Sequence, residues 1–371
     1  MAGSRIKQLR QVAASDGFSG KSEEATMAAF VEDTTPWTGG KVTQRSWCVL
    51  GNNASPMTYT GTNTWILHEP ESQHALVVDP APAGTHIKHI QQVCADLGVS
   101  IAAILLTHTH FDHTEGAADL ALATGAPIFV HNVQAYRDYV QEQLSHGEIE
   151  AADSIDNLVV LPLEVGEFGE TEVFGKLADS EAFGKRAESE GHGKLGRSGG
   201  LEKIGESEKL EGFEEGNLPQ LSVITLSGHS SDSVALLYKA DRSLLVGDVV
   251  FRHGPTVVYH PDGILKDYLD SLDTLERIAQ DGSVERFLPG HGYPITNMVS
   301  CIEATRQHRL VRLQQIEDAL EAGIAPAADP LVDAIYRDTD ARLRPAALKS
   351  VQAQLMYLGF DAGDDLPDYH D

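Results

Sequence analysis

The stretch Ile104–Gly116, ILLTHTHFDHTEG, decides how this chain is organised. Residues 101–106 form an apolar run that predicts a buried strand, and polar side chains begin at Thr107. His108 and His110 are two residues apart, so both imidazoles point to the same side as long as the backbone stays extended. The strand therefore delivers two metal-capable side chains to one place.

Asp112 and His113 follow directly, and we expect them on the turn into a helix over residues 115–122 that is closed by Gly125. Zn²⁺ binds imidazole nitrogen and carboxylate oxygen at about 2.0 to 2.2 Å, and ligands on a rigid corner bind it without ordering a loop. Histidines at a helix start can also be ordinary surface or core residues. Three histidines and an aspartate crowded behind one buried strand favour a metal site.

Four more polar residues follow apolar, strand-like runs. His229 lies in LSGHSSDS, Asp248 in LLVGDVVF and His291 in FLPGHG, and each of these dipeptides alone would indicate only a turn. Asp79 ends the run HALVVD, where it either starts an Asp-Pro turn or orients a ligand imidazole. The first three indicate a site only when they are taken together, because each follows its own strand-like run.

The motif HTHFDH resembles the H-x-H-x-D-H motif of metallo-β-lactamase-fold hydrolases, and the resemblance extends over residues 60–294. It implies an α/β protein, an αββα sandwich, that hydrolyses an ester, thioester or phosphodiester with a metal-bound hydroxide. The resemblance assigns one ion to His108, His110 and His229. It assigns the second ion to Asp112, His113 and His291, with Asp248 bridging both.

The same resemblance implies two Zn²⁺ ions, with iron or manganese tolerated because no ligand is a thiolate. It also gives roles to two aspartates. Asp112 would orient the hydroxide and carry its proton, and Asp79 would lie buried behind the metal site, supporting a ligand.

Composition and spacing predict three regions. Residues 1–40 read as a partly ordered leader, residues 41–296 as the catalytic domain and residues 297–371 as a helical C-terminal domain. Within the catalytic domain, residues 176–216 are rich in Gly, Glu, Lys and Ser, which predicts a flexible insertion. His192 in that insertion reads as a solvated side chain.

The C-terminal region contains three helical patterns, and the first carries His308, Arg309 and Arg312 in the order His-Arg-x-x-Arg. This order resembles the winged-helix-like tail of the lactamase-like endoribonuclease branch. The plainer alternative is a docking or dimer module, through which the chain would form a homo-oligomer.

Charge and composition limit the partners. The net charge is −27, from 28 basic and 55 acidic residues, and such a field repels polyanions unless a local basic patch overrides it. No run of about 18 apolar residues is present to span a membrane. The N-terminal residues show no apolar core of a signal peptide, so we expect a cytoplasmic protein. The three cysteines lie far apart and read as reduced, buried residues.

Three functions remain open at this stage. A hydroxyacylglutathione-type thioesterase shares the ligand set, although its basic glutathione-binding signature is not recognisable here. A single-strand endoribonuclease is supported by the tail and opposed by the acidic charge. A non-catalytic metal-binding module requires loss of ligands, and all seven are present. The partner is thus a small-molecule substrate or single-stranded RNA.

Deletion of residues 176–216 should leave the fold and metal binding intact, because this segment carries no ligand and no apolar periodicity. Thermal unfolding and metal content of the deletion variant test this expectation. A large fall in the melting temperature would mean that the segment packs against the domain.

Overall fold

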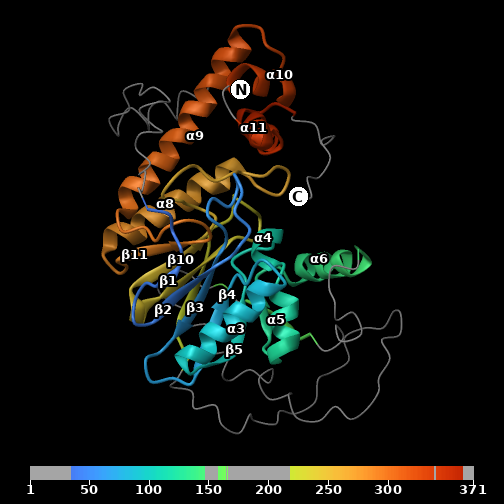
Figure 1. The fold of residues 1–371 in the computed structure, drawn as a ribbon. Helices are drawn as coiled ribbons and strands as arrows, with labels where there is room; N and C mark the ends of the chain where they lie inside the picture. Colours follow the sequence, from blue (N-terminus) through green and yellow to red (C-terminus); the bar gives the residue numbers. More distant parts are fainter. Residues whose placement is uncertain (1–34, 147–157, 164, 166–217, 338–339, 362–371) are drawn as a thin grey trace.

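Two β-sheets form the centre of the molecule (Figure 1), in a computed structural model that describes residues 35–146, 158–163, 165, 218–337 and 340–361. The first sheet has the order β1-β2-β3-β4-β5-β6-β7 and the second has the order β11-β10-β9-β8. The strands of the first sheet are β1 Gly40–Lys41, β2 Ser46–Leu50, β3 Asn63–His68, β4 His74–Val78, β5 Ser100–Leu105, β6 Ile128–Val130 and β7 Val160–Pro162. Those of the second are β8 Leu221–Thr225, β9 Val234–Tyr238, β10 Ser243–Gly247 and β11 Arg286–Pro289.

Both sheets are mixed. In the first, β1 to β4 pair antiparallel and β4 to β7 pair parallel. In the second, β8, β9 and β10 pair antiparallel, whereas β10 and β11 pair parallel. The strands β3 and β4 form an antiparallel hairpin.

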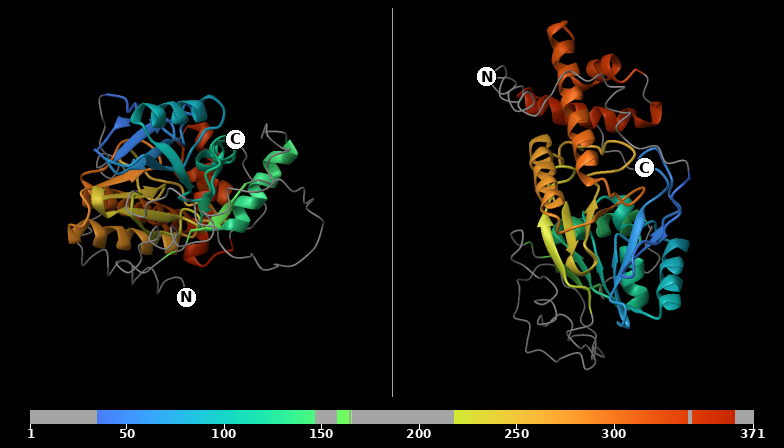
Figure 2. Two further views of the ribbon diagram at one scale, coloured as in Figure 1. Left: turned by 90° about the horizontal axis from the view of Figure 1, so that it is seen from below. Right: turned by 90° about the vertical axis from the view of Figure 1, so that its left-hand side faces the viewer.

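Helices cover the outer face of each sheet (Figures 1 and 2). The helices α3 Thr85–Leu97, α5 Ala117–Thr124 and α6 Val133–His146 pack on the first sheet, whereas α8 Leu265–Asp281 packs on the second. The helix α9 Met298–Glu321 packs against α8 and extends beyond the sheets (Figure 2). Short 3₁₀ turns lie at η2 Lys239–Asp241 and η3 Ala341–Leu343. The predicted αββα sandwich is confirmed.

The strands are apolar throughout because both of their faces are buried. In β5, Ile104 packs under the helices of the first sheet, whereas Ala103 and Leu105 face the second sheet. In β10, Leu244 faces the outer helices and Leu245 faces the first sheet. This period of two explains why the runs read as strands without polar alternation.

The strands bring the candidate site residues to one edge of the sandwich. The strands β4, β5, β8, β10 and β11 each end shortly before a residue of the predicted site. Because β8, β10 and β11 run in the same direction, His229, Asp248 and His291 leave the second sheet at the same edge. The bond from Val234 N–H to the carbonyl of Thr107 joins this edge to the first sheet, with N and O 2.9 Å apart.

The helix expected over residues 115–122 differs in its start. A short helix, α4 Phe111–Thr114, already includes Asp112 and His113, and α5 begins separately at Ala117. The hydroxyl of Thr114 donates to the carbonyl of His110 at 3.0 Å, which closes the first turn just behind the extended His110. Asp112 and His113 therefore lie within a helix rather than on a turn, and the expected end at Gly125 is confirmed.

Three C-terminal helices stand at the site edge of the sandwich (Figures 1 and 2). They are α9, α10 Ala328–Ile335 and α11 Arg344–Leu358, as the sequence predicted. They share one apolar cluster with α8, which includes Leu272, Leu313, Leu331 and Leu355. Among the helices in the described part of the chain, none is long and apolar enough to cross a membrane. Most of the predicted leader, as well as the predicted insertion with His192, lies outside the described residues.

The loop that carries His229 presses against α8 without space for a side chain. Gly228 has φ +128°, and a Cβ placed there would lie 2.1 Å from the backbone nitrogen of Tyr268. Only glycine adopts this backbone without strain, and only glycine permits this contact. The position of His229 thus depends on the residue before it.

Replacing Gly228 by alanine should therefore destabilise the fold and displace His229. We expect a loss of roughly 3 kcal/mol, because a positive φ and overpacking against backbone each cost on the order of 1 to 3 kcal/mol. Gly282→Ala is the matched control, since Gly282 also has a positive φ of 75° but has nothing near its Cβ position. Denaturant unfolding measures both variants, and equal losses would show that the contact with α8 is unimportant.

Candidate metal centre

The first group of candidate ligands consists of His108, His110 and His229. Nε2 of His108 lies 3.1 Å from Nδ1 of His110, and Nε2 of His229 lies 2.9 Å from the same atom. His108 and His229 are buried, and their rings meet edge to face. Three imidazole nitrogens from two sheets thus converge on one point, the arrangement in which three histidines hold Zn²⁺.

The second group consists of Asp112, His113, Asp248 and His291. Nε2 of His113 lies 3.2 Å from a carboxylate oxygen of Asp248, and Nε2 of His291 lies 3.2 Å from Asp112 and 3.3 Å from Asp248. In each group, one nitrogen or oxygen from every residue lies within 4.8 Å of the others. The structure therefore brings all seven predicted ligands together, in the two sets that the sequence suggested.

Asp248 connects the two groups. Its Oδ1 faces His113, and its Oδ2 faces both His291 and, at 3.9 Å, His229 of the first group. A carboxylate in this position could be shared between ions held by the two groups. Asp248 also comes directly after β10, whose buried backbone limits its movement.

Three buried atoms of the second group that could bind a metal make no hydrogen bond of normal geometry among the described residues. These atoms are Nε2 of His113, Nε2 of His291 and Oδ1 of Asp248. Such atoms are costly to bury unless a hydrogen bond or a cation satisfies them. Because every donor in both groups is an imidazole nitrogen or a carboxylate oxygen, the residues fit divalent ions of the zinc, iron or manganese type.

The electrostatic environments of the two groups differ. Burial, followed by the neighbouring His110, lowers the pKa of His229 to about 4, and burial also lowers the pKa of His108 and His110. Burial opposes charge on His291 as well, but the carboxylates of Asp248 and Asp112 outweigh it and raise its pKa to about 9. The three-histidine group is thus neutral at pH 7, as ligand imidazoles must be.

The opposite shifts act on the carboxylates. Burial would raise the pKa of Asp248, yet the charges of His291 and His113 hold it well below the usual range. The pKa of Asp112 is likewise lowered, because His113 and His291 outweigh burial. Both carboxylates are therefore ionised at neutral pH, which is the form that binds a cation.

A second layer of contacts orients the imidazoles. Oδ2 of Asp79 lies 3.0 Å from Nδ1 of His113, and both oxygens of Asp79 accept hydrogen bonds from Thr107. Nδ1 of His229 faces the carbonyl of Val257 at 2.6 Å. Each contact occupies Nδ1 and leaves Nε2 directed toward the centre. The two interpretations of Asp79 were a turn residue and a residue that orients a ligand. Its contact with His113 favours the second.

Several residues of this layer were missed by sequence reasoning. Thr107 holds Asp79 with its backbone and side chain, and its only signal was its place between the apolar run and His108. The carbonyl of Gly61 faces Nδ1 of His291 at 3.2 Å. Gly290 leaves room for the centre, because a Cβ there would lie 2.3 Å from Oδ1 of Asp248. Backbone groups give no sequence signal, so neither contact could have been found.

Aromatic side chains surround the centre. The ring of Tyr259 lies 6.1 Å from that of His110, and the ring of Phe251 lies 5.6 Å from that of His291. Tyr59 packs edge to face on Phe251. Tyr259 thus lies beside a candidate ligand of the first group. Aromatic rings thus lie beside a candidate ligand of each group.

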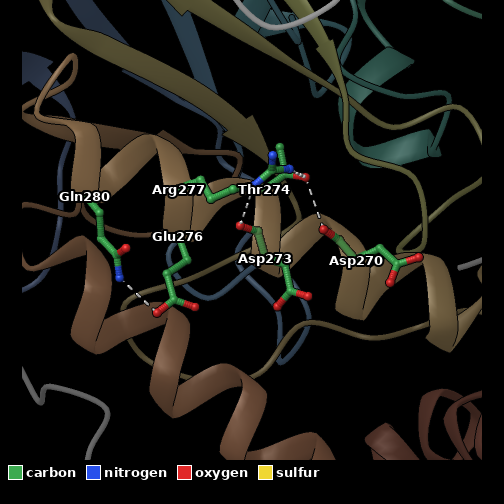
Figure 3. A pocket seen from close by; sticks show the side chains of 6 residues that line it. All are labelled: Asp270, Asp273, Thr274, Glu276, Arg277 and Gln280. Atoms are coloured by element: carbon green, nitrogen blue, oxygen red, sulfur yellow. Dashed lines mark hydrogen bonds between the residues drawn. The ribbon is translucent and has the colours of Figure 1, made fainter. Parts of the chain in front are cut away.

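A separate polar hollow of about 570 Å³ lies along α8 and is lined by residues of that helix alone (Figure 3). Arg306 of α9 contacts its acidic side chains, 2.7 Å from Asp273 and 2.8 Å from Glu276. None of its lining residues belongs to either candidate ligand group of the described chain. The chemistry of the protein therefore lies at the edge of the sandwich.

Comparisons with known proteins agree with this site. Residues 57–291 match the model of the metallo-beta-lactamase superfamily, and residues 327–359 match the beta-lactamase associated winged helix domain. A beta-lactamase-like protein 2 homolog of Caenorhabditis elegans is 23% identical over 323 residues, covering 86% of both chains. An atrochrysone carboxyl ACP thioesterase of Pseudocercospora fijiensis is 35% identical over 316 residues, covering 85% of this chain and 70% of the relative.

A solved structure shares the fold. The beta-lactamase domain protein from Burkholderia ambifaria superimposes with a TM-score of 0.58 at 20% identity, covering 88% of this chain and 89% of that one. The family match includes the motif HTHFDH and extends to His291, the last of the converging residues. With its αββα sandwich, its His and Asp cluster and its C-terminal winged-helix match, the chain belongs to the metallo-beta-lactamase superfamily.

Proposed function

We propose that this chain is a zinc-dependent thioester hydrolase. The observation that carries the proposal is the position of Asp248 between a three-histidine group and a His/Asp group, with aromatic rings beside both groups. The ions would be held by His108, His110 and His229 on one side and by Asp112, His113 and His291 on the other, with Asp248 shared. Iron or manganese would also fit these ligands.

When bound, the two ions supply Lewis acidity at the carbonyl oxygen and lower the pKa of a water molecule toward neutrality. The residues of the protein hold the ligands in place. Asp79 and Thr107 fix the orientation of His113, and Val257 fixes that of His229. Ligands held in this way need no rearrangement when substrate arrives.

Asp112 is the best placed proton carrier. Its side chain is 30% exposed, whereas that of Asp248 is 9% exposed, so Asp112 is the more accessible of the two carboxylates. Asp112 is ionised at neutral pH, as a proton acceptor must be, although its lowered pKa makes it a weak base. The water oxygen then bonds to the carbonyl carbon, the C–S bond breaks, and Asp112 returns the proton to the departing thiolate. One thioester and one water give one carboxylic acid and one thiol.

A thioester fits the charge of the chain better than RNA does. At a net charge of −27 the protein repels a polyanion over long distances, whereas a thioester group is neutral. The P. fijiensis relative is named a thioesterase, and its similarity covers 85% of this chain. RNA cleavage is the competing outcome of the same assay.

The assay compares three substrates with one zinc-loaded preparation: an acyl-coenzyme A, the same acyl group on pantetheine, and a single-stranded RNA oligomer. We expect hydrolysis of at least one thioester, detected by thiol release, and no RNA cleavage. Asp112→Asn should reduce thioester turnover at least about 100-fold, since positioned proton transfer contributes 10²- to 10⁴-fold. RNA cleavage without thiol release would refute the proposal.

Metal content and activity should distinguish the Asp248→Asn variant from the Asp79→Asn variant. Wild-type protein should bind two ions per chain, and Asp248→Asn should keep the fold but lose one ion and on the order of 100-fold or more in turnover. Asp79→Asn should weaken metal affinity roughly 10- to 100-fold yet retain turnover at saturating zinc, because Asp79 acts through His113.

Mass spectrometry of bound metal and thiol-release kinetics measure these variants. The exposed Asp96→Asn, which removes the same charge from a surface helix, is the control and should behave like wild type. Full activity and two ions in Asp248→Asn would contradict the assignment of the bridge.

A further inference from the structure

Residues 61–64, GTNT, join the two sheets at the second group of candidate ligands. The three side chains of this segment are fully buried. Thr62 pairs with His291 in an isolated antiparallel bridge, and the N–H of Asn63 donates to the carbonyl of Gly290 at 2.7 Å. The segment leads into β3 of the first sheet, whereas His291 follows β11 of the second. Residues 61–64 therefore contact the far sheet at the place where it delivers a candidate ligand.

Asn63 holds the loop that carries His291. Its Nδ2 donates to the carbonyl of Pro289 at 3.0 Å and to that of Gly292 at 2.7 Å, so one amide group binds the backbone on both sides of His291. Its Oδ1 accepts from the indole N–H of Trp37 at 2.8 Å. Because an indole nitrogen only donates and a carbonyl only accepts, these partners fix the orientation of the amide. Both hydrogens of the Asn63 amide are thus used on the backbone around a candidate ligand.

Thr62 holds the helix that carries Asp112. Its hydroxyl donates to the carbonyl of Asp112 at 2.8 Å. The same hydroxyl oxygen accepts from Nδ2 of Asn53 at 3.0 Å, and the backbone N–H of Thr62 donates to Oδ1 of Asn53 at 2.9 Å. A hydroxyl has one hydrogen, and Asn53 supplies a donor, so the hydrogen of Thr62 is directed to Asp112. The helix α4 is thereby fixed to the segment.

Thr64 holds Asp79 and, through it, His113. The hydroxyl of Thr64 donates to the carbonyl of Asp79 at 2.9 Å, and Nε2 of His86 lies 2.9 Å from the same hydroxyl oxygen. Asp79 has φ 52°, a left-handed backbone that is uncommon for residues other than glycine. From this backbone its carboxylate reaches Nδ1 of His113 at 3.0 Å. A contact that fixes the backbone of Asp79 therefore also supports the orientation of His113.

Gly61 completes the segment. Its carbonyl faces Nδ1 of His291 at 3.2 Å. Its φ is +128°, and a Cβ placed there would lie 2.0 Å from the carbonyl oxygen of Gly51. Only glycine adopts this backbone without strain and permits this contact. The segment is thus held in one position before it reaches the ligands.

The ligands of the first group are held by other residues. The carbonyl of Val257 faces Nδ1 of His229 at 2.6 Å, and the hydroxyl of Thr256 lies 3.3 Å from the same atom. The hydroxyl of Thr107 lies 3.1 Å from Nδ1 of His108. Thr107 serves both groups, because it also holds Asp79. The two groups therefore depend on largely different contacts, and one group can be weakened without the other.

We propose that residues 61–64 position the ligands of the second ion as one unit, so that the second ion depends on them and the first does not. Each contact falls on a ligand, on the backbone that carries a ligand, or on Asp79. Ligands that are already held in place bind an ion without ordering a loop. The inference rests on the two-ion centre of the proposed function and is independent of the substrate.

Zinc titration of the metal-free protein tests the proposal. Wild-type protein should bind two ions. Thr62→Val and Thr64→Val keep the size of the side chain but lose the hydroxyl, and each should weaken the second ion roughly 10- to 100-fold while the first keeps its affinity. Asn63→Asp, which replaces both amide donors by an oxygen, should do the same. Thr62→Ser and Thr64→Ser retain the hydroxyl and should bind both ions like wild type.

Calorimetry with a competing chelator resolves the two binding steps. Equal weakening of both ions in the valine variants would overturn the proposal. Wild-type affinity for both ions in Thr62→Val and Thr64→Val would also overturn it.

Cobalt gives a readout that a loss of stability alone would not change. The visible absorption of Co²⁺ depends on its coordination geometry, and Co²⁺ accepts nitrogen and oxygen ligands. The first equivalent should produce the same spectrum in wild type and in Thr62→Val. The spectral change of the second equivalent should require a higher Co²⁺ concentration in the variant. A different spectrum at the first equivalent would contradict a role limited to the second ion.

Ser243→Ala is the matched control for a lost buried hydroxyl. Ser243 is fully buried, and its hydroxyl donates to Asp241 at 2.8 Å, at the end of β10 away from Asp248. The control should lower the melting temperature of the metal-free protein, as Thr62→Val should, because each variant removes a buried hydrogen bond. Both ions should bind to it as they bind to wild type. A selective loss of the second ion in Ser243→Ala would show that position in the fold is unimportant and would refute the proposal.

Hydrogen exchange of the wild-type protein decides the question even if a variant does not fold. The amides of Thr62 and Asn63 exchange when the segment opens locally. If that opening releases the second ion, zinc slows the exchange by mass action. Exchange at these two amides should therefore slow with the second equivalent of zinc and not with the first. Unchanged exchange in the two-ion protein would refute the proposal.

The failures of the two proposals are distinguishable. A wild-type protein that binds only one ion would refute the two-ion centre and this inference with it. Two bound ions without a selective effect of the valine variants would refute the role of residues 61–64 alone. A selective effect without thioester hydrolysis would refute the proposed reaction and leave the positioning role standing.

Discussion

The contact of one carboxylate with three histidines holds the centre of this protein together. Asp248 lies within 3.2 to 3.9 Å of His113, His229 and His291, which come from three different segments. Without a carboxylate, the buried imidazoles of either group would repel one another when they are protonated. The carboxylate offsets that repulsion. This attraction lowers the pKa of Asp248 and raises the pKa of His291.

That contact depends on the way the two sheets end. The strands β8, β10 and β11 point in one direction, and the bond between Val234 and Thr107 ties their edge to the end of β5. Because both faces of these strands pack closely against apolar neighbours, a shift in register would exchange the two faces and disrupt the packing of both layers. Apolar packing thus fixes the ligand positions, and the layer formed by Asp79 and Thr107 fixes the ring orientations.

The C-terminal helices add a second kind of environment to the same edge. The catalytic side contributes histidines and carboxylates, whereas α9 and α11 contribute Arg309 and Lys349. Tyr259 lies against both environments, since its ring contacts His110 on one side and the Lys349 ammonium on the other. Tyr259 is therefore a point at which the C-terminal helices contact the metal centre.

The sequence by itself determined the type of chemistry. The spacing in HTHFDH, the apolar runs before His229, Asp248 and His291, and the three C-terminal helices were readable because periodicity and residue type are local properties. The start of the first site helix was placed too late, because nothing local showed that Phe111 to Thr114 already form a short helix. Only the tertiary structure decided that Asp79 contacts His113, that Gly61 and Val257 orient two ligands, and that Lys349 lies against Tyr259. These contacts join residues far apart in the chain or use backbone carbonyls, and such proximity is set by strand order and packing, which no local pattern encodes.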